Sequence, residues 1–358
     1  MKNQTDDTHN QTSSAPLFNK FASRTGLNRI FSLLPGSPSP LVGWAGLWVA
    51  VAVTIQAYKY FNGYTVAYIN NPATILGDLQ ILLAAVAVQY LYERYEKALD
   101  QIDFAERTTE PQSFTAIIPT QWQIIIYIIA IIYTFITFFL LKGIGTLTEI
   151  GGFAEVVFAA VVAPIGYATV TAEFVGAYLG IMFLLPRRIK QRDFKLHFLD
   201  PEGLGGLRPV GELMKTSYYF IVAGLMIWLF IMYGPFIMGQ FLDTQLSRPG
   251  FIINSAFTGA WLLSIATMAY GLSQLHWYMK SKKRKELTRL DRQAREHVEN
   301  PFNLQEYDVT DQEKFDDFRG RMDYVNATKE YPTTFTMWSQ ILISLILPKA
   351  IQIVLSSL

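Results

Sequence analysis

Few residues that could do chemistry lie inside the apolar stretches of this chain, and Glu173 lies deepest among them. It is nine residues from Pro164 and 14 residues from Arg187, which on a helix places it roughly 13 Å from one end and about 21 Å from the other. Ionisable groups inside a membrane are costly, rare and usually functional. Glu173 is therefore a candidate proton, cation or substrate site. The alternative is a protonated or hydrogen-bonded packing residue.

Other polar residues in the apolar stretches could belong to the same intramembrane site. Glu155 precedes Glu173 by 18 residues, or five turns, so the two acids share a face if the helix is continuous. Asp78 lies near the outer end of its stretch, where an acid also complements the helix dipole. Thr169 lies one turn before Glu173. Polar residues of two later stretches could meet Glu173 across the bundle: Gln240, Asn254, Ser264 and Thr267.

A glycine-rich segment between two apolar stretches is the second candidate site. In the loop 187–216, Gly203, Gly205 and Gly206 precede Arg208, which begins the next predicted helix. A glycine-rich turn that leads into a helix N-terminus can bind a phosphate group, but the P-loop spacing and the dinucleotide fingerprint are both absent. The segment is either a structural elbow at the lipid headgroups or a site for an anionic lipid or ligand.

The composition limits the remaining chemistry. The chain contains no cysteine, which excludes disulfides, thiolate nucleophiles and cysteine-ligated metals. The four histidines, His9, His197, His276 and His297, show no metal-binding spacing, and no hydrolase nucleophile motif is present. We therefore predict no catalytic residue, no bound metal and no cofactor. The net charge of +1 does not indicate a nucleic-acid partner.

The elements that must position these residues are membrane-spanning helices. Seven apolar stretches reach the roughly 20 residues that a helix needs to cross a bilayer: 41–60, 74–95, 118–142, 158–186, 217–242, 252–279 and 335–357. They are continuous rather than alternating, and helices satisfy their own backbone in lipid. The sequence therefore predicts an all-α polytopic transmembrane helix bundle of about seven spans.

The basic residues predict the orientation of this bundle. Of 30 Lys and Arg residues, only Lys59, Lys142, Arg248 and Lys349 fall on one side of the predicted membrane. Because positive residues favour the cytoplasmic side, we expect a multi-pass protein of the cell membrane. Its N-terminus should be cytoplasmic and its C-terminus extracytoplasmic.

The chain divides into four regions. Residues 1–40 are predicted to combine a disordered N-terminus with an amphipathic interfacial segment at 17–34. Residues 41–279 form the transmembrane region of six spans, and 334–358 form the final transmembrane helix. Between them, 280–333 is predicted to be a cytoplasmic helical hairpin.

Two apolar stripes support the hairpin. They recur at helical spacing on its two halves and consist of Leu287, Leu290, Ala294 and Val298, then Phe315, Phe318, Met322 and Val325. Thr310 with Glu313 suggests a capping box for the second helix. Either the stripes bury each other, or they form a coiled-coil contact in a homo-oligomer. The basic start of the hairpin also fits anionic lipid headgroups, which with the bilayer are the expected partners.

Short motifs in the second half of the chain resemble those of prokaryotic multi-pass membrane proteins of uncharacterised function. The motifs are DPEGLGGLRPVGEL before one span, and EYPTTF followed by a last span closing on LILP. The likeness covers residues 187–358. It implies a prokaryotic membrane protein and no particular activity.

Three classes of function fit these observations. The intramembrane acids favour a channel- or transporter-like protein, or its accessory subunit. The predicted cytoplasmic helices favour a membrane-embedded sensor or scaffold that binds partners. A membrane enzyme acting on lipid is the third class. A polar cavity that converges on Glu173 would favour transport, whereas a packed bundle with accessible cytoplasmic helices would favour a sensor or scaffold.

Overall fold

The computed structural model describes residues 15–33, 36–108, 114–241, 249–303 and 308–357. It confirms an all-α bundle with seven helices long and apolar enough to cross a membrane. The helices of six spans are α4 (Pro40–Phe61), α6 (Ile75–Gln101), α8 (Thr120–Phe135), α12 (Arg208–Phe241), α13 (Phe251–Arg295) and α15 (Phe335–Ser357). The fourth span in chain order is built from several pieces between Ile144 and Gln191.

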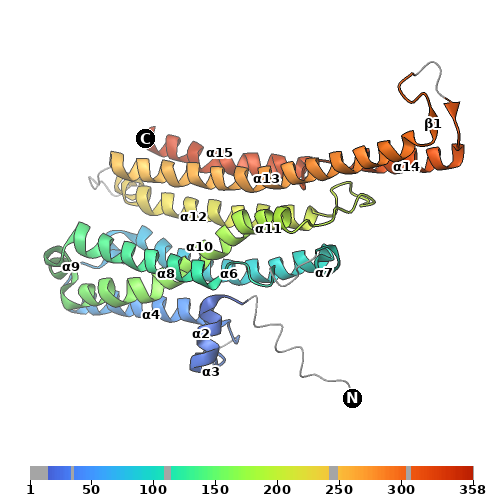
Figure 1. Cartoon of the computed structure of the whole chain (residues 1–358). Coiled ribbons are helices and arrows are strands. Elements are labelled where there is room, and N and C mark those ends of the chain that lie inside the picture. Colours follow the sequence, from blue (N-terminus) through green and yellow to red (C-terminus); the bar gives the residue numbers. More distant parts are fainter. Residues whose placement is uncertain (1–14, 34–35, 109–113, 242–248, 304–307, 358) are drawn as a thin grey trace.

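The spans form two layers (Figure 1). One layer holds α4, α6 and α8 with the pieces of the fourth span, and the other holds α12, α13 and α15. The layers meet chiefly where α6 packs along α12, and where α11 (Leu185–Gln191) packs on α13. One large apolar cluster fills the space between these helices.

The fourth span is interrupted because its sequence cannot form one regular helix. It begins as α9 (Ile144–Val157), which bends at Gly151 and Gly152, and continues as a π-helical stretch, Phe158–Tyr167, around Pro164. Proline lacks the backbone N–H that an α-helical turn requires. Two further pieces precede α11, namely α10 (Ala168–Leu179) and a second π-helical stretch, Gly180–Leu184.

Short elements connect the spans. A π-helical stretch extends α8, a 3₁₀ turn precedes α6, and two helices of four residues flank α6 in the chain. These elements are Ile136–Lys142, Pro72–Thr74, α5 (Ala67–Asn70) and α7 (Phe104–Arg107). They place the ends of the spans without adding further crossings.

The N-terminal amphipathic segment is two helices rather than one. α2 (Leu17–Thr25) and α3 (Leu27–Phe31) are separated by Gly26, whose φ is +79°. Only glycine adopts this left-handed conformation routinely. Phe18 and Ala22 of α2 are buried, and α2 packs against α4 and α10. The segment therefore docks on the bundle through its apolar residues.

The helical hairpin is present and intramolecular. α13 runs on beyond its apolar part, and α14 (Gln312–Ala327) packs back along it. A two-residue strand pair, β1 (Val298–Glu299) with β2 (Asp308–Val309), joins them. Leu290, Ala294 and Val325 are buried in this contact. The strand pair takes Val298 out of the predicted helix, which ends at Arg295.

The predicted cap of the second hairpin helix is wrong by one residue. Asp311, not Thr310, is the N-cap of α14, and its side chain accepts a hydrogen bond from the backbone N–H of Lys314. The backbone N–H of Thr310 instead bonds to the carbonyl of His297. Aspartate and threonine both serve as caps, so the strand pairing decides which of them is used.

Candidate functional site

Glu173 lies in α10 and is fully buried, with 0% of its surface exposed. Its carboxylate accepts hydrogen bonds from the backbone N–H of Phe18 at 2.6 Å, the Tyr127 hydroxyl at 2.7 Å and the Gln123 side-chain amide at 3.2 Å. We call these four residues the Glu173 cluster. It ties three helices together, namely α10, α8 and the N-terminal α2.

The bond from Phe18 gives Glu173 a structural role. Phe18 is the second residue of α2, so its N–H is one of the donors that a helix leaves unpaired at its N-terminus. An acid there also complements the helix dipole. A small cavity beside the cluster, lined by Lys20, Tyr92 and Gln123 among others, holds about 10 Å³, close to the minimum for one water molecule.

The other two intramembrane acids have partners of their own. Glu155 pairs with the buried Lys59 of α4 at 2.9 Å. Asp78, in the first turn of α6, accepts hydrogen bonds from the hydroxyls of Tyr68 and Tyr167. The π-helical stretch between Glu155 and Glu173 breaks the regular spacing that would place them on one face.

The side chain of Thr169 makes its hydrogen bond within the fourth span, where its hydroxyl donates to the carbonyl of Ile165 at 2.6 Å. Ser264 and Thr267 of α13 do not meet Glu173 either. The Thr267 hydroxyl lies 2.5 Å from the Tyr178 hydroxyl of α10, and the Ser264 hydroxyl bonds within α13. Tyr178 and Glu173 are five residues apart, about 140° around a helix. α13 therefore contacts the face of α10 that is opposite the Glu173 cluster.

Asn254 belongs to a separate polar cluster near the predicted outer side. Its side chain accepts hydrogen bonds from Tyr233 at 2.5 Å and from Gln352 at 3.1 Å. Lys349 joins through Thr258 and Gln352, at 2.9 and 2.7 Å. The side chain of Gln240 lies outside the described part of the structure. The predicted intramembrane residues whose side chains the structure describes are therefore distributed over separate clusters and form no single path through Glu173.

The backbone N–H groups of the glycine-rich loop do bind an anionic group, which is the side chain of Asp200 in the loop itself. The Asp200 carboxylate accepts the backbone N–H groups of Glu202 at 3.2 Å, Leu204 at 2.9 Å and Gly206 at 2.8 Å. Burial alone would raise the pKa of Asp200, but these three donors hold it below its usual value of 3.8. The loop's own carboxylate therefore occupies these backbone donors, and binding of an external anionic lipid or ligand by the loop stays a prediction.

Three glycines make this turn possible. Gly203, Gly205 and Gly206 have φ values of +66°, +64° and +69°, in the left-handed region that other residues rarely adopt. Arg107 fixes the turn from the other side. Its guanidinium donates to the carbonyls of Gly205, Lys195 and Ile102 at 2.8, 2.8 and 3.1 Å. These hydrogen bonds show that Arg107 positions the loop.

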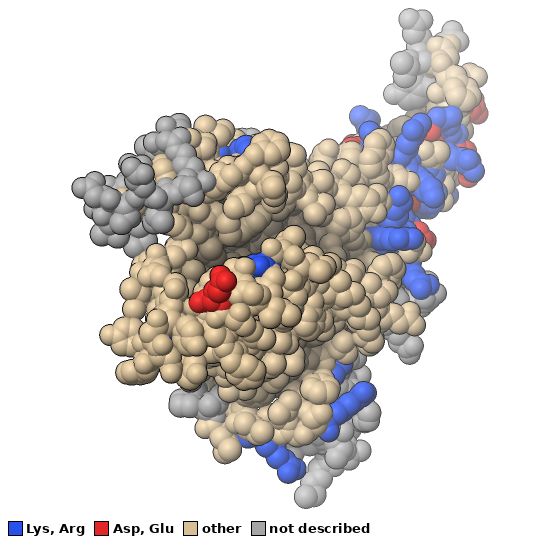
Figure 2. Space-filling view, turned by 90° about the vertical axis from the view of Figure 1, so that its left-hand side faces the viewer, with Lys and Arg blue, Asp and Glu red and all other residues tan. Residues whose placement is uncertain are grey.

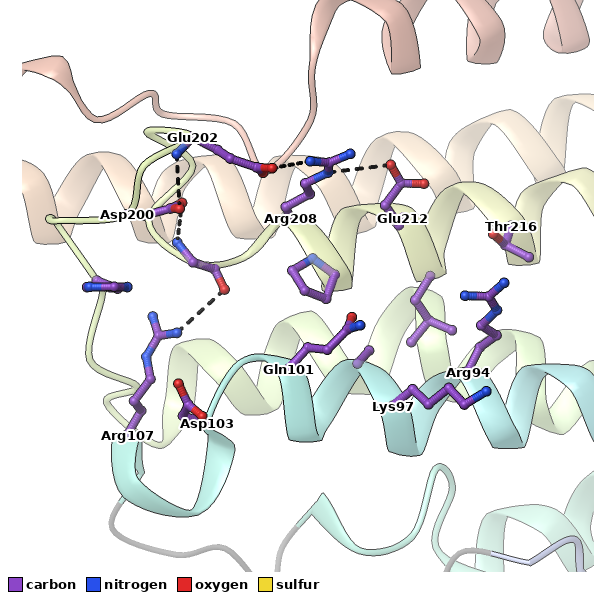
Figure 3. Close-up of a pocket in the computed structure, with 15 residues that line it drawn as sticks. Arg94, Lys97, Gln101, Asp103, Arg107, Asp200, Glu202, Arg208, Glu212 and Thr216 are labelled. Atoms are coloured by element: carbon purple, nitrogen blue, oxygen red, sulfur yellow. Dashed lines mark hydrogen bonds and ion pairs between the residues drawn. The ribbon is translucent and has the colours of Figure 1, made fainter.

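An open cavity of about 540 Å³ lies beside this loop (Figure 3), and we call it the boundary pocket. Its volume is within the range of roughly 300–1,000 Å³ typical of small-molecule sites. One wall is the last turns of α6 and the other is the first turns of α12. The charged and polar lining residues are Arg94, Lys97, Gln101, Asp103, Arg107, His197, Asp200, Glu202, Arg208, Glu212 and Thr216.

The acidic groups of the boundary pocket are largely engaged, whereas two basic groups are not. Glu202 and Glu212 both pair with Arg208, and Asp200 is held by the loop backbone. Within the described residues, Lys97 has no hydrogen bond or ion pair, and Arg94 uses only its Nε, which donates to the Tyr90 hydroxyl at 2.8 Å. Figure 3 shows the Arg94 guanidinium pointing toward α12 near Thr216.

Arg94 and Lys97 entered the sequence-based predictions only among the basic residues that indicate orientation. A signal was present, because Arg94, Lys97 and Gln101 follow a spacing of three and four residues, which places them on one face of a helix. Arg208, which was predicted as part of the loop site, does line the pocket. It is nevertheless paired with two acids.

No family model, curated protein or solved structure that was compared with the chain matches it. Among the described residues, no group of three or more His, Asp or Glu side chains is placed to hold a metal ion. The fold defines a multi-pass membrane protein, and its specific function must be argued from its own geometry.

Proposed function

We propose that this protein is a membrane-embedded sensor for an anionic, phosphate-bearing group. The ligand binds in the boundary pocket, and the helical hairpin of α13 and α14 responds. The observation that carries the proposal is that one loop, Asp200–Gly206, both lines the pocket and bonds to the hairpin. This is the second of the three classes that the sequence suggested.

The charge of the boundary pocket supports an anionic ligand. Arg94 and Lys97 face the cavity without acidic partners in the described structure. Of the four acids on its walls, Glu202 and Glu212 are engaged by Arg208, Asp200 is held by backbone donors, and Asp103 interacts electrostatically with Arg107. Arginine matches the oxygens of a phosphate with two parallel hydrogen bonds, and lysine adds a compact charge. An entering phosphate group would therefore find two cations and the neutral donors of Gln101 and Thr216.

The connection to the hairpin is short and direct. The carbonyl of Gly203 accepts the backbone N–H of Lys329 at 2.7 Å, just after the end of α14. Lys283 of α13 donates to the carbonyls of Asn326 and Thr328, both at 2.8 Å. A ligand that shifts the loop therefore acts on the junction at which α14 leaves α13.

The orientation predicted from the basic residues supports the same proposal. It places the boundary pocket and the hairpin on the cytoplasmic side of the cell membrane, with the C-terminus outside. Figure 2 looks at the opposite end of the bundle, where few charged side chains are visible. Lys and Arg gather instead on the receding hairpin. This asymmetry is what a cytoplasmic hairpin requires.

Transport is the second candidate function, and the burial of Glu173 within its span favours it. The carboxylate already accepts three hydrogen bonds, and the cavity beside it holds about 10 Å³. This geometry supports a packing role better than a conducting path. A lipid enzyme remains the third class, and assembly into a homo-oligomer remains a prediction.

Ligand binding is tested with the double variant Arg94→Gln/Lys97→Gln in neutral detergent. The probes are glycerol 1-phosphate and phosphatidylglycerol, which present the same phosphate chemistry from water and from the membrane. Each basic residue near an anionic surface contributes about 1 kcal/mol, so the double variant should bind about 25-fold more weakly. The matched control is Arg187→Gln/Lys195→Gln, which removes two exposed charges at the same predicted boundary outside the pocket.

Coupling to the hairpin is tested by a distance measurement, for which the absence of cysteine is convenient. Spin labels at Asp100→Cys on α6 and Arg319→Cys on α14 report the separation of the pocket wall and the hairpin. Adding the probe should shift the distance distribution of the parent and leave that of Arg94→Gln/Lys97→Gln unchanged. Binding with no shift in the parent would contradict a sensor, and equal binding by both proteins would contradict the pocket itself.

A further inference from the structure

A second hollow lies along the same two helices, deeper in the bundle. Two cavities of about 210 and 400 Å³ share the lining residues Gln80, Phe174 and Gly224, so they form one groove. We call it the seam groove. It passes between α6, α10, α12 and α13, and its far wall includes Trp228. Its lining is mostly aliphatic and aromatic, as an acyl chain requires.

The seam groove begins where the boundary pocket ends. Thr216 of the pocket and Phe220 of the groove are one helical turn apart on α12. The Phe220 ring packs against Tyr90 at 5.9 Å, and the Tyr90 hydroxyl accepts the bond from Arg94. One aromatic pair therefore lies between the charged pocket and the apolar groove, with its hydroxyl bonded on the polar side.

The distance from the boundary pocket to the far wall of the seam groove corresponds to one leaflet of a membrane. From Thr216 to Trp228 is twelve residues of α12, or about 18 Å at the helical rise. Half of a hydrocarbon core is about 15 Å thick. An occupant with its charged end at the boundary pocket would therefore reach the middle of the bilayer along this seam.

From this continuity we infer that the ligand of the boundary pocket is an anionic membrane phospholipid. Its phosphate group contacts Arg94 and Lys97, and one of its acyl chains lies in the seam groove against Phe174 and Trp228. The inference rests on the proposed binding of a phosphate-bearing group. It adds that the phosphate group belongs to a lipid, because a free phosphate has no acyl chain to occupy the apolar groove beneath the pocket.

Gly224→Leu tests the acyl-chain site. Gly224 lines both parts of the groove, and a Cβ there would meet its nearest atom, Nε2 of Gln80, at 3.8 Å. The backbone therefore accepts a side chain, which then fills the groove. The matched control is Gly259→Leu on α13, where a Cβ has nothing within 4 Å. Thr171→Phe, at an exposed position that lines the groove, is a second blocking variant in case the first fails to fold.

The measurement is native mass spectrometry of the detergent-solubilised protein. Long-chain phosphatidylglycerol is compared with long-chain phosphatidylcholine and with glycerol 1-phosphate. The parent should retain phosphatidylglycerol in preference to phosphatidylcholine. Gly224→Leu or Thr171→Phe should lower its retention about threefold or more and leave the binding of glycerol 1-phosphate unchanged, and Gly259→Leu should behave like the parent.

The two proposals fail in different ways. If Arg94→Gln/Lys97→Gln loses both probes while the groove-blocking variants retain phosphatidylglycerol as the parent does, the phosphate site stands and the acyl-chain site is refuted. If the charge variant binds both probes as the parent does, the phosphate site is refuted, and with it the lipid. Equal retention of phosphatidylcholine and phosphatidylglycerol by the parent would also overturn the inference.

Discussion

The Glu173 cluster and the boundary pocket are two of the places where the described part of this bundle concentrates polar groups, and they are built in opposite ways. In the Glu173 cluster a fully buried carboxylate has three donors of its own, from three different residues. In the boundary pocket two cations face an open cavity and lack acidic partners in the described structure. A buried polar group that is satisfied stabilises a fold, whereas an exposed group that is unsatisfied is available to a ligand.

The same contrast appears inside the glycine-rich loop. Its backbone donors have the geometry of an anion site, yet the Asp200 carboxylate already occupies them. The first turn of α2 is occupied in the same manner by Glu173. Two features that would attract an external anion are thus filled by acids of the chain. Under the proposed function, ligand binding is left to the side chains of α6.

The largest effect is expected from Glu173→Ala. It leaves the Phe18 N–H, the Tyr127 hydroxyl and the Gln123 amide without their acceptor, and losing one partner of a buried charged network costs about 3–5 kcal/mol. Unfolding in mixed micelles measures this loss, with the exposed acid variant Glu149→Ala as the control. If Glu173→Ala is as stable as the parent, the Glu173 cluster does not stabilise the fold, and Glu173 again becomes a candidate transport residue.

The next effect concerns the ion pair between Lys59 and Glu155. Lys59→Met leaves the partly buried Glu155 without its cation and should cost about 3 kcal/mol in the same unfolding assay. Adding Glu155→Leu should recover most of that loss, because two apolar residues can replace a buried ion pair. If the double variant is as unstable as the single one, the pair has a role beyond packing.

A smaller effect is expected in the loop. Asp200→Asn should lower the free energy of unfolding by about 1–2 kcal/mol, because the carboxylate accepts three backbone donors. The pKa of Asp200 is lower in the folded protein than its usual value of 3.8. Its stabilising contribution is therefore complete above pH 3.8 and is lost as the pH falls through the lower folded pKa. The variant should lack this acid-dependent loss, which a pH series of unfolding curves would show.

The smallest effect on stability is expected from Arg94→Gln/Lys97→Gln. Substitutions of exposed residues with few partners usually change stability by less than about 0.5 kcal/mol. This variant should unfold like the parent although it loses its ligand. Combined loss of stability and of binding would mean that the two cations support the fold, and the contrast between the two regions would disappear.

The sequence was sufficient to predict the helices but not the hydrogen-bond partners of the polar residues. Seven apolar stretches and two apolar stripes predict the spans and the hairpin, because hydrophobic burial determines both. The burial of Glu173 was also predictable from the cost of a charge in lipid. One of its donors was not, since the backbone N–H of Phe18 has no sequence signature and lies 155 residues away.

The loop was partly predictable for a related reason. Gly203, Gly205 and Gly206 predict a turn with left-handed backbone conformations. Their pattern does not indicate whether the backbone N–H groups of this turn bind a carboxylate of the chain or an external phosphate. Arg94 and Lys97 were visible at helical spacing. Their exposure to a cavity depends on the packing of α6 against α12, which a single sequence does not specify.

The contact between α2 and Glu173 also constrains how the protein is made. The helix that begins at Leu17 leaves the ribosome early, but its acceptor is synthesised 155 residues later. At roughly 5–20 residues per second, this delay is on the order of ten to thirty seconds. During that time α2 can pack on α4, but the backbone N–H of Phe18 lacks its acceptor in α10. Complete docking of α2 therefore requires that the fourth span has been made and packed beside it.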